Sequence, residues 1–404
     1  MMIDTADFLI IGGGIVGLSI ARQLRAIHGS NICIAVLEKE PRIGLHSSGR
    51  NSGVMHSGIY YSGGSLKAKV CGEGAREMLA WCEERGLPVR RCGKVLVPVK
   101  EKDGPQVDLL LARAQQNGVR AERLDRQALA ELEPEARSAT GEAIWCPETS
   151  VIDPKSVLTR LVQELRSDGV EIRFSEAFRG VDRDQRTVLT TRGRINFGYV
   201  INAAGLHADS VAHAFGVGKR YALLPFRGVY WKLAPSSGLD IRGLIYPVPD
   251  LNVPFLGVHT TTSTSGNIYF GPTAMPALGR ESYAGLSGVV WAEAMRIVSN
   301  LGVQFVRNTQ GFRNLAFQES RKTLKSGFVH DAQRLIPRLY SEHLQRCDKV
   351  GLRAQMLDLH RRELVMDFLI ERGEREIHIL NAISPAFTSA FAFARHVIEQ
   401  YFQR

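Results

Sequence analysis

The 404-residue sequence predicts a protein of the α/β class (α+β overall), in which a Rossmann-like dinucleotide-binding domain carries an inserted antiparallel-sheet domain for substrate. Two observations predict this fold. In the first half of the chain, short apolar runs alternate with stretches of helical spacing, and the first run leads into a glycine-rich turn. After Pro225, short β-rich runs are separated by Pro, Gly and Ser. The first pattern favours a parallel sheet and the second an antiparallel one.

The amino-terminal glycines have the spacing of a phosphate-binding turn. An apolar run at 8–11 predicts a buried strand, and Gly12, Gly14 and Gly17 follow in the pattern G-x-G-x-x-G as a helix begins. Gly12 would form the tight turn, Gly14 would let a pyrophosphate approach the backbone, and Gly17 would let the helix pack on the strand. The free N–H groups and the positive end of that helix attract phosphates.

A second apolar run, 32–37, ends at an acidic residue. Glu38 follows Gly17 by 21 residues, and its carboxylate is placed to accept hydrogen bonds from a ribose. We assign Lys39 to the same site. A dinucleotide site is predicted by the combination of a strand, a glycine turn, a helix, a second strand and an acidic residue. A glycine triplet alone would be weak evidence.

The composition favours a small acidic partner. The net charge is +10, and the basic residues are spread along the chain. No RNA- or DNA-binding motif occurs, so we expect no nucleic-acid partner. A small anionic substrate or an anionic membrane surface fits the charge better.

Six cysteines are present, at irregular spacing and without a C-x-x-C pair. This pattern argues against a zinc site and a disulfide framework, and we expect no metal. It is typical of a reducing compartment. We find neither a signal peptide nor an apolar run of the ~20 residues that span a bilayer. We therefore expect a cytoplasmic protein, with peripheral contact to the inner face of the membrane as an open alternative.

The remaining elements before Pro225 alternate between the two types. Strands are predicted at 95–99 and 170–174, a hairpin around Gly193 from 188–191 and 194–197, and a strand at 199–205. Helices are predicted at 66–85, 106–117 and 126–132. A further helix starts at Pro154, with Asp153 as its N-cap, and ends near Gly169.

After Pro225 we predict strands at 228–233, 244–246, 255–262 and 267–271, helices at 286–301 and 328–344, a strand at 376–380 and a helix at 385–402. The dinucleotide-binding domain is then discontinuous and comprises residues 1–88, 146–220 and 346–404. The substrate-binding domain comprises 89–145 and 221–345.

Only one dinucleotide site is predicted. Gly72-Glu-Gly74 fails as a second site, because Glu77 stands at the third glycine position and no strand precedes it. Electrons must therefore pass directly from an organic substrate to the bound cofactor. The acid after the second strand fits both NAD and FAD.

Six stretches resemble a known family: Gly49 to Tyr61, with Asn-Ser-Gly-Val-Met-His-Ser-Gly inside it, Gly-Ser-Leu-Lys-Ala at 64–68, Pro-Phe-Arg-Gly at 225–228, Pro-Phe-Leu-Gly-Val-His at 254–259, Gly-Leu-Arg-Ala-Gln at 351–355 and Asn381 to Ser389. In order and nearly end to end, they are similar to the L-2-hydroxyglutarate oxidase or dehydrogenase branch of the D-amino-acid-oxidase-like flavoproteins. The resemblance implies FAD and direct oxidation of a small anionic 2-hydroxy acid to 2-oxoglutarate by hydride transfer to flavin N5. Dioxygen and a membrane quinone both remain open as the electron acceptor.

Two alternatives stay open beside this interpretation. One is a flavin oxidase of an amine or D-amino acid, and the other is a non-catalytic FAD-binding protein. Ile383, Phe387 and the stretch 361–367 depart from the family pattern, which leaves the exact 2-hydroxy acid open.

Two histidines are the candidate catalytic bases. His56 lies in the glycine-rich loop and His259 follows an apolar run, and an imidazole has a suitable intrinsic pKa for taking a hydroxyl proton. His378, between two isoleucines, is a candidate for substrate binding. For each of these histidines, the alternative to a functional role is a structural one, in which the ring is hydrogen-bonded to the backbone or packed in the core.

A substrate with two carboxylates needs cationic partners. Arg353 is the first choice because its stretch matches the family, followed by Arg227 and Lys67. A guanidinium can bind a carboxylate through two parallel hydrogen bonds. Tyr60 and Tyr61 are candidate donors, and only one of them should face the substrate because neighbours on a strand point oppositely.

The resemblance also implies the cofactor-binding positions. It places Ser48, Asn51, Ser52 and Gly53 beside the flavin, and Ala204 and Gly205 in a turn close to the nucleotide. Near the carboxyl end it implies Asn381, Ser384, Pro385 and Thr388. They precede or begin a helix whose N–H groups would stabilise negative charge on the reduced flavin. We expect the FAD to be noncovalent, since a link to Cys347 is the less favoured reading.

Overall fold

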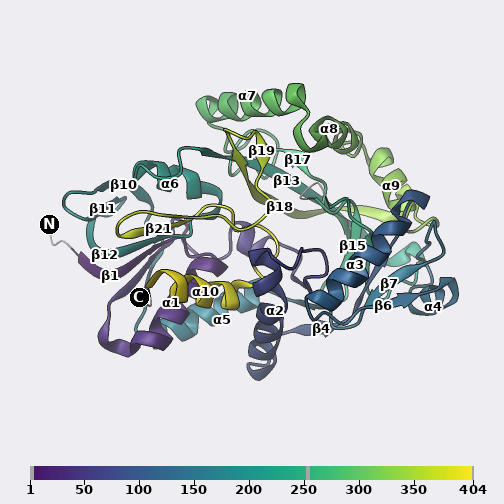
Figure 1. The fold of residues 1–404 in the computed structure, drawn as a ribbon, viewed down its shortest axis with the longest axis horizontal. Helices are drawn as coiled ribbons and strands as arrows, with labels where there is room; N and C mark the ends of the chain where they lie inside the picture. The colour runs from purple at the N-terminus through teal and green to yellow at the C-terminus, as the bar shows by residue number, and fades with distance from the viewer. Residues whose placement is uncertain (1–3, 252–254, 403–404) are drawn as a thin grey trace.

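The computed structural model describes residues 4–251 and 255–402. A mainly parallel sheet with its helices occupies one end of the molecule, and smaller antiparallel sheets occupy the other (Figure 1). This mixture matches the predicted class, α/β with an antiparallel part. Among the described residues, no helix combines the length and the apolar character needed to cross a bilayer.

The first sheet has the strand order β10-β11-β12-β1-β2-β9, and β21 and β20 continue from β12. Its bounds are β1 Asp4–Ile11, β2 Ile34–Leu37, β9 Glu171–Arg173, β10 Phe178–Asp182, β11 Thr187–Thr190, β12 Arg194–Asn202, β20 Ile370–Arg372 and β21 Glu376–Ile379. Strand β1 pairs in parallel with both β12 and β2. The predicted hairpin at Gly193 is confirmed, since β11 and β12 pair antiparallel across it.

Both faces of this sheet are covered, which explains the continuous apolar run of β1. Phe8 and Ile10 pack under helices α1 (Ile15–His28), α5 (Pro154–Ser167) and α10 (Ala390–Phe402). Leu9 and Ile11 face the other way, toward β11, β12 and Phe215, which follows α6 (Ala208–Ala214). Helix α2 (Leu66–Glu84) packs against α10.

The second sheet is antiparallel and has the order β15-β16-β13-β18-β19, with β17 beside β13. Its bounds are β13 Tyr221–Leu233, β15 His259–Thr262, β16 Ile268–Gly271, β17 Met275–Pro276, β18 Leu344–Asp358 and β19 Glu363–Leu364. Strands β13 and β18 pair from Tyr221 opposite Asp358 to Leu233 opposite Leu344, with one register shift between Val229 and Trp231.

Two small sheets and five helices complete the part of the chain that the structure describes. The sheets are β14-β5-β7-β6 and β3-β8-β4. Their strands are β3 Val54–Met55, β4 Val89–Arg91, β5 Lys94–Val97, β6 Glu122–Leu124, β7 Ala143–Cys146, β8 Ser150–Ile152 and β14 Leu244–Pro247. The helices are α3 Gly104–Gln116, α4 Arg126–Leu132, α7 Trp291–Arg307, α8 Phe312–Arg321 and α9 Lys325–Gln333. Short 3-10 helices include η2 Ser47–Gly49, η3 Glu101–Asp103 and η4 Gly205–His207.

Several element predictions were wrong in extent, among them the strand predicted at 228–233, which belongs to β13 and begins at Tyr221. The helix predicted at 328–344 is α9, which ends at Gln333, and β18 was not predicted at all. The helix predicted at 286–301 begins at Trp291 and runs to Arg307, and the one predicted at 385–402 begins at Ala390. Within 255–262, only the segment from His259 is a strand. Strand β18 escaped because its first half is partly exposed and carries charged residues, so it lacks an apolar pattern.

The division into domains stays a prediction. Strand β18 lies inside the stretch 346–404, which the sequence analysis assigned to the dinucleotide-binding domain, but it pairs along its length with β13.

Phe393 tests the packing of α10 on the first sheet. It is 1% exposed and lies 4.5 Å, between ring centroids, from Phe368. We expect Phe393→Ala to lower the free energy of unfolding by ~3–5 kcal/mol in urea titrations, because it leaves a cavity. Phe317→Ala is the control, since Phe317 is 57% exposed, and it should change that free energy by no more than about 0.5 kcal/mol. Equal losses in the two variants would contradict this packing.

Candidate cofactor and substrate site

The turn between β1 and α1 has the close approaches that the glycines predict. Gly12 has a φ of +113°, and an added Cβ would lie 2.5 Å from the Ala203 carbonyl oxygen. At Gly17 a Cβ would overlap the Gly12 carbonyl oxygen. Gly14 lines a cavity, and the next amide, that of Ile15, donates to Ser48 Oγ at 3.0 Å. The first turn of α1 therefore faces a polar loop and an open space, as a phosphate site requires.

Glu38 lies directly after β2, next to this turn. Its carboxylate accepts a hydrogen bond from the Glu40 amide at 2.9 Å. Burial raises the pKa of Glu38, and the amide partners oppose this rise only in part. The position fits the predicted ribose contact, which stays a prediction.

Lys39 turns away from the cavity. Its Nζ lies 2.7 Å from a Glu281 carboxylate oxygen and 2.9 Å from His46 Nε2, and it also pairs with Glu40. Glu40, His46 and Glu281 form the cluster of potential metal ligands found among the described residues. The Lys39 ammonium lies among these three groups and supplies the positive charge. His207 Nε2 lies 2.7 Å from a Glu281 carboxylate oxygen. This cluster therefore connects the segment after β2 with η4 and with the segment after β17.

The segment that begins with η2 lines the cavity, with Ser48 in η2 itself and with Asn51 and Ser52 in the loop after it. Asn51 Nδ2 donates to the Ser48 carbonyl oxygen at 2.7 Å, and Asn51 Oδ1 accepts from the Gly53 amide at 2.9 Å. Gly53 has a φ of +75°, and a Cβ there would overlap the Ile152 carbonyl oxygen. Asn51 and Gly53 thus shape the loop, while Ser48 and Ser52 face the cavity.

Two further segments of the predicted cofactor site reach the cavity. Gly205 lines it from η4, and the Ala204 amide is held by Asn202 Oδ1 at 3.1 Å. Near the carboxyl end, Ser384, Pro385 and Thr388 line it. Helix α10 begins at Ala390, after these residues.

Asn381 does not face the cavity. It is fully buried, accepts from the Met356 amide at 3.0 Å, and donates to the carbonyl oxygens of Val365 and Asp367 at 3.0 and 2.7 Å. Its side chain therefore holds β18 and the segment before β20 together.

The cavity has a volume of about 300 Å³ and runs from the glycine turn to the antiparallel sheets. Of the predicted catalytic and substrate residues, His56, His259 and Arg353 line it. One space beside the dinucleotide turn thus contains side chains from four distant segments of the chain, namely His56, Tyr246 of β14, His259 of β15 and Arg353 of β18.

His259 has a defined proton arrangement. Its Nδ1 lies 2.9 Å from the Gly257 carbonyl oxygen, which can only accept, so Nδ1 carries the hydrogen and Nε2 of the neutral ring is free to accept one. The ring stacks on Tyr246 with 3.9 Å between centroids. His56 is also buried, and its Nδ1 has no hydrogen-bond partner among the described residues. Burial lowers the pKa of both histidines to about 3, so both are neutral near pH 7.

Arg353 is a partly buried cation that faces the cavity without a counterion. It lies on β18 opposite Phe226, and its guanidinium is 5.1 Å from the centroid of the Phe255 ring. Its Nε has no hydrogen-bond partner, and no ion pair to it occurs among the described residues. Burial lowers the pKa of Arg353 to about 10, so the guanidinium remains protonated near pH 7. An unpaired cation that is partly removed from water is costly, which favours an anionic ligand here.

Arg227 does not join this group. In the β13–β18 register Arg227 lies opposite Leu352, which precedes Arg353 in the chain. Because successive side chains of a strand point to opposite faces, the two arginines face opposite sides of the sheet. Neither Arg227 nor His378 lines the cavity. His378 is fully buried in β21, with Nδ1 3.1 Å from Asn202 Nδ2 and its ring against Phe215. It has the surroundings of a core histidine.

Tyr60, Tyr61 and Lys67 lie outside the cavity lining. Lys67 Nζ donates to the Met366 carbonyl oxygen at 2.6 Å and lies 5.7 Å from the Tyr61 ring centroid. Burial lowers the pKa of Lys67 to about 7, and the charge of Arg353 acts in the same direction. Tyr61 and Lys67 lie close enough to Arg353 for its charge to act on them, whereas Tyr60 lies beside Lys94. Direct substrate contact by the three residues stays a prediction.

Sequence reasoning missed Tyr246, Lys94 and Glu319. Tyr246 and Glu319 line the cavity, and Lys94 is fully buried near it. Glu319 accepts from the Ala274 amide at 2.6 Å and pairs with Lys322. A charged residue inside the apolar strand 94–97 was the available signal for Lys94, whereas nothing local marks the other two.

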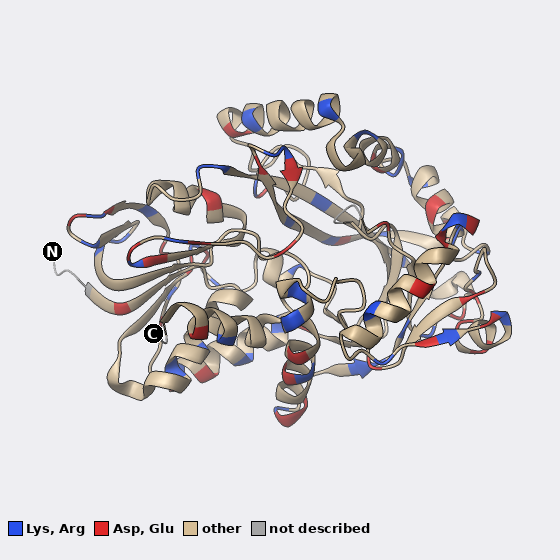
Figure 2. Cartoon of the chain, viewed as in Figure 1, with Lys and Arg blue, Asp and Glu red and all other residues tan. Residues whose placement is uncertain are grey.

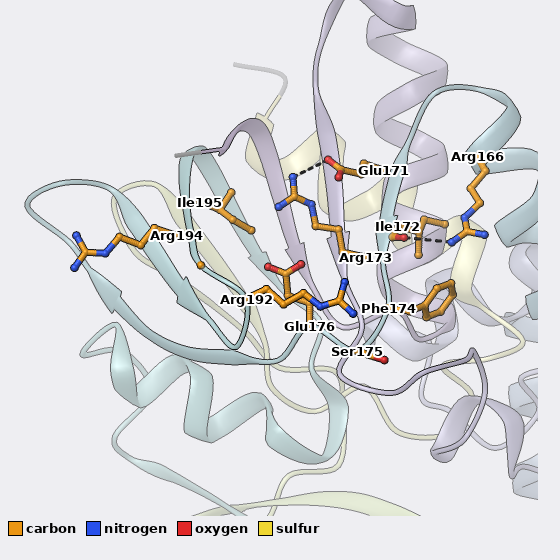
Figure 3. Close-up of a pocket in the computed structure, with 11 residues that line it drawn as sticks. Arg166, Glu171, Ile172, Arg173, Phe174, Ser175, Glu176, Arg192, Arg194 and Ile195 are labelled. Carbon is orange, nitrogen blue, oxygen red and sulfur yellow. Dashed lines mark hydrogen bonds and ion pairs between the residues drawn. The ribbon is translucent and has the colours of Figure 1, made fainter. Parts of the chain in front are cut away.

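A second, more polar hollow of about 590 Å³ lies beside β9 and the turn before β12 (Figure 3). Four arginines border it, at positions 166, 173, 192 and 194. Glu171 and Glu176 border it as well, and Arg173 pairs with Glu171 at 2.8 Å. None of the predicted site residues lies in it.

Comparison with known proteins agrees with this geometry. A family model described as FAD dependent oxidoreductase (DAO) matches residues 7–400. The chain belongs to the FAD-dependent oxidoreductase (DAO) family. FAD is therefore its cofactor, and the flavoprotein class and enzymatic character predicted from the sequence are confirmed.

The relatives of this DAO family member agree with the predicted branch. It is 35% identical over 398 residues to L-2-hydroxyglutarate dehydrogenase of Escherichia coli K12, covering 98% of this chain and 92% of the relative. It is 35% identical over 418 residues to the mitochondrial L-2-hydroxyglutarate dehydrogenase of Homo sapiens, covering 98% and 89%. The resemblance stated from the six stretches is thus confirmed.

Solved structures of the same fold are more distant in sequence. L-alpha-glycerophosphate oxidase from Mycoplasma pneumoniae superposes with a TM-score of 0.76 at 21% identity, covering 98% of this chain and 94% of that one. Glycine oxidase from Geobacillus kaustophilus gives 0.73 at 17% identity, covering 98% and 94%. At such identities the likeness shows the fold, and it confirms the predicted class.

The glycine turn provides a direct test of cofactor binding. We expect Gly17→Ala to lose most of its bound FAD, because the new methyl group would push α1 away from the Gly12 carbonyl. The readout is the flavin-to-protein ratio after purification, with circular dichroism as a check of folding. Gly302→Ala is the matched control, since a Cβ at this helical glycine meets nothing within 4 Å. Full FAD content in a folded Gly17→Ala would contradict the assignment.

Proposed function

We propose that the enzyme oxidises L-2-hydroxyglutarate, or a closely related 2-hydroxy acid, to 2-oxoglutarate. The single observation that carries this proposal is the unpaired, partly buried Arg353, which shares a cavity with two neutral histidines and with the dinucleotide turn. Relatives that match nearly the whole chain carry the name L-2-hydroxyglutarate dehydrogenase. Electrons leave the enzyme to dioxygen or to a quinone.

The residues of the cavity supply binding and proton transfer. Arg353 binds one carboxylate of the substrate through paired hydrogen bonds and so fixes the carbon that carries the hydroxyl group. Nε2 of His259, or a ring nitrogen of His56, takes the hydroxyl proton. When bound, FAD supplies the two-electron acceptor for the C–H bond. The apolar ring of Phe255 beside Arg353 limits water around the bound carboxylate.

Anaerobic reduction of the flavin tests the substrate class. L-2-Hydroxyglutarate should bleach the flavin absorption band under argon, and amino acids such as glycine and D-alanine should not. Bleaching by an amine alone would overturn the proposal in favour of an amine oxidase. A flavin that none of these compounds reduces would favour a non-catalytic FAD-binding protein.

Arg353 should determine substrate affinity. We expect Arg353→Met to raise the Michaelis constant or the dissociation constant for L-2-hydroxyglutarate roughly 10- to 100-fold, because charged hydrogen bonds to the carboxylate are lost. The FAD content should not change. Arg346→Met is the matched control, since Arg346 is exposed on the same strand. Similar kinetics in the two variants would remove Arg353 from the binding site.

We further propose peripheral contact with an anionic membrane through a surface defined by residues 286–324. Nine of the 13 large apolar side chains that are exposed in the described structure lie in this stretch, namely Leu286, Val290, Trp291, Met295, Val298, Phe305, Val306, Phe317 and Leu324. Several of them lie on one stripe of α7, next to the face that Ala294 and Ile297 bury. A helix with so wide an apolar surface is normally covered over all of it.

The charges of the 286–324 surface suit a bilayer with anionic lipids. Arg296, Arg307, Arg313 and Arg321 are exposed there. The acidic residues of the same stretch are engaged, because Glu293 pairs with Arg280 and Glu319 pairs with Lys322. Figure 2 shows α7 and α8 along one edge of the molecule, with basic residues on them. Apolar side chains with an aromatic ring and flanking cations are typical of interfacial helices.

Co-sedimentation with vesicles that contain phosphatidylglycerol tests this contact. The protein should sediment with these vesicles at low salt, and Met295→Glu combined with Val306→Glu should sediment at least severalfold less, because burying a carboxylate in the interface is costly. Leu109→Glu is the control, since Leu109 is 43% exposed on α3. Failure of the unmodified protein to bind, or equal binding by all three proteins, would contradict the proposal.

A further inference from the structure

Lys94 is a buried cation with no assigned partner. It begins β5, pairs in the sheets with Cys146 and Leu244, and is 0% exposed. Its Nζ has no hydrogen-bond partner among the described residues. The Nζ lies 4.7 Å from the ring centroid of Tyr60 and 5.6 Å from that of Tyr246.

This arrangement is costly, because buried ammonium groups are normally paired with a carboxylate. The ionisable groups that act on Lys94 are two thiols, those of Cys71 and Cys146, and burial raises the pKa of both, so both are neutral. Burial lowers the pKa of Lys94 itself. The faces of the two aromatic rings oppose this and favour the ammonium form. A charge kept at such a cost is expected near a functional site.

Tyr246 connects Lys94 to the candidate bases. Its ring lines the cavity, stacks on His259 at 3.9 Å between centroids, and meets the His56 ring edge-on at 6.5 Å. The tyrosine hydroxyl is buried beside the Thr261 side chain. The groups that pack against the Tyr246 ring also set its position, and Lys94 is one of them.

Lys94 also acts on both histidines through its charge. After burial, the charge of Lys94 is the largest influence that lowers the pKa of His56, followed by His259 and Arg353. For His259, the Gly257 carbonyl raises the pKa, while Lys94 and then Lys322 lower it. Lys94 is the cation common to both.

We propose that Lys94 is a positioning residue of this active site, which holds Tyr246 beneath His259 and keeps both imidazoles unprotonated when an anionic substrate enters. A dianion brought close to the histidines favours their protonated forms, and a protonated imidazole cannot take the hydroxyl proton. The ammonium group behind Tyr246 counteracts that effect. The inference rests on the proposed function for the nature of the anion.

The test compares Lys94→Met, which removes the charge at similar size, with Lys94→Arg, which keeps it. Anaerobic flavin reduction by L-2-hydroxyglutarate is followed by stopped flow across pH. In Lys94→Met, the acidic limb of the rate profile should move to higher pH by about one unit, because a nearby positive charge has been lost. Lys94→Arg should keep the limb of the unmodified protein. Lys102→Met, at an exposed lysine of η3, is the control.

A second readout needs no turnover. The ring ¹³C signals of His56 and His259 are assigned through His56→Gln and His259→Gln, and are followed as the pH of the FAD-loaded protein is lowered. Protonation should occur at higher pH in Lys94→Met than in the unmodified protein. If Lys94→Met fails to load FAD, Lys94→Gln replaces it in both measurements.

The outcomes separate the two proposals. A loss of stability with an unmoved acidic limb and unmoved histidine signals would overturn the role of Lys94, since that is what mere packing predicts. If no 2-hydroxy acid reduces the flavin of the unmodified protein, that result would instead contradict the proposed function. The pH at which the histidine signals shift would still test the role of Lys94.

Discussion

The pairing of β13 with β18 is the constraint on which the site depends. It joins two segments more than a hundred residues apart in the chain and places Arg353 opposite Phe226, on the face that borders the cavity. A shift of one residue would turn Arg353 to the other face and bring Leu352 in its place, because side chains alternate along a strand. The register of β13 and β18 thus determines on which face of the sheet the Arg353 guanidinium lies. Asn381 supports this register from the side, since its oxygen accepts from the Met356 amide of β18 and its nitrogen donates to two carbonyl oxygens beyond it.

The cavity combines a neutral proton acceptor with unpaired positive charge, and burial produces both. Removal from water lowers the pKa of His56 and His259, which leaves the rings neutral. The same desolvation lowers the pKa of Arg353 only to about 10, so this group stays charged. One physical effect therefore yields two opposite charge states near pH 7, because the ordinary pKa values of imidazole and guanidinium are so far apart. Acid and base roles are commonly separated in active sites by such differences of environment.

Local signals allowed much of the first sheet and the glycine turn to be predicted from the sequence. Gly17 and Glu38 are fixed by contacts within one strand–helix–strand unit, so their spacing carries the information. Gly12 shares that local signal through its place in the turn, although the backbone that crowds it comes from Ala203, after β12. The rest of the site depends on contacts between distant segments. The sequence could not show that Arg353 and Arg227 face opposite sides, because that follows from the β13–β18 register. Nor could it show that Lys39 pairs with Glu281 or that His378 lies beside Asn202, since each partner comes from a remote segment. Strand β18 itself lacked an apolar pattern because its first half is partly exposed and carries charged residues.

The distribution of charge around the cavity also bears on the choice between a hydroxy acid and an amine. Arg353 lines the cavity, Lys67 lies behind it, and Lys94 lies behind the two histidines, while no carboxylate forms an ion pair with Arg353 or Lys94 in the described part of the chain. A 2-hydroxy diacid would bring two negative charges into this positive region. An amino acid would satisfy Arg353 with its carboxylate, but its ammonium group would meet the repulsion of the remaining cations. Because the site is desolvated, that repulsion is screened much less than in water. The electrostatics of the cavity therefore favour an anion with an uncharged reacting carbon, in agreement with the 2-hydroxy acid class.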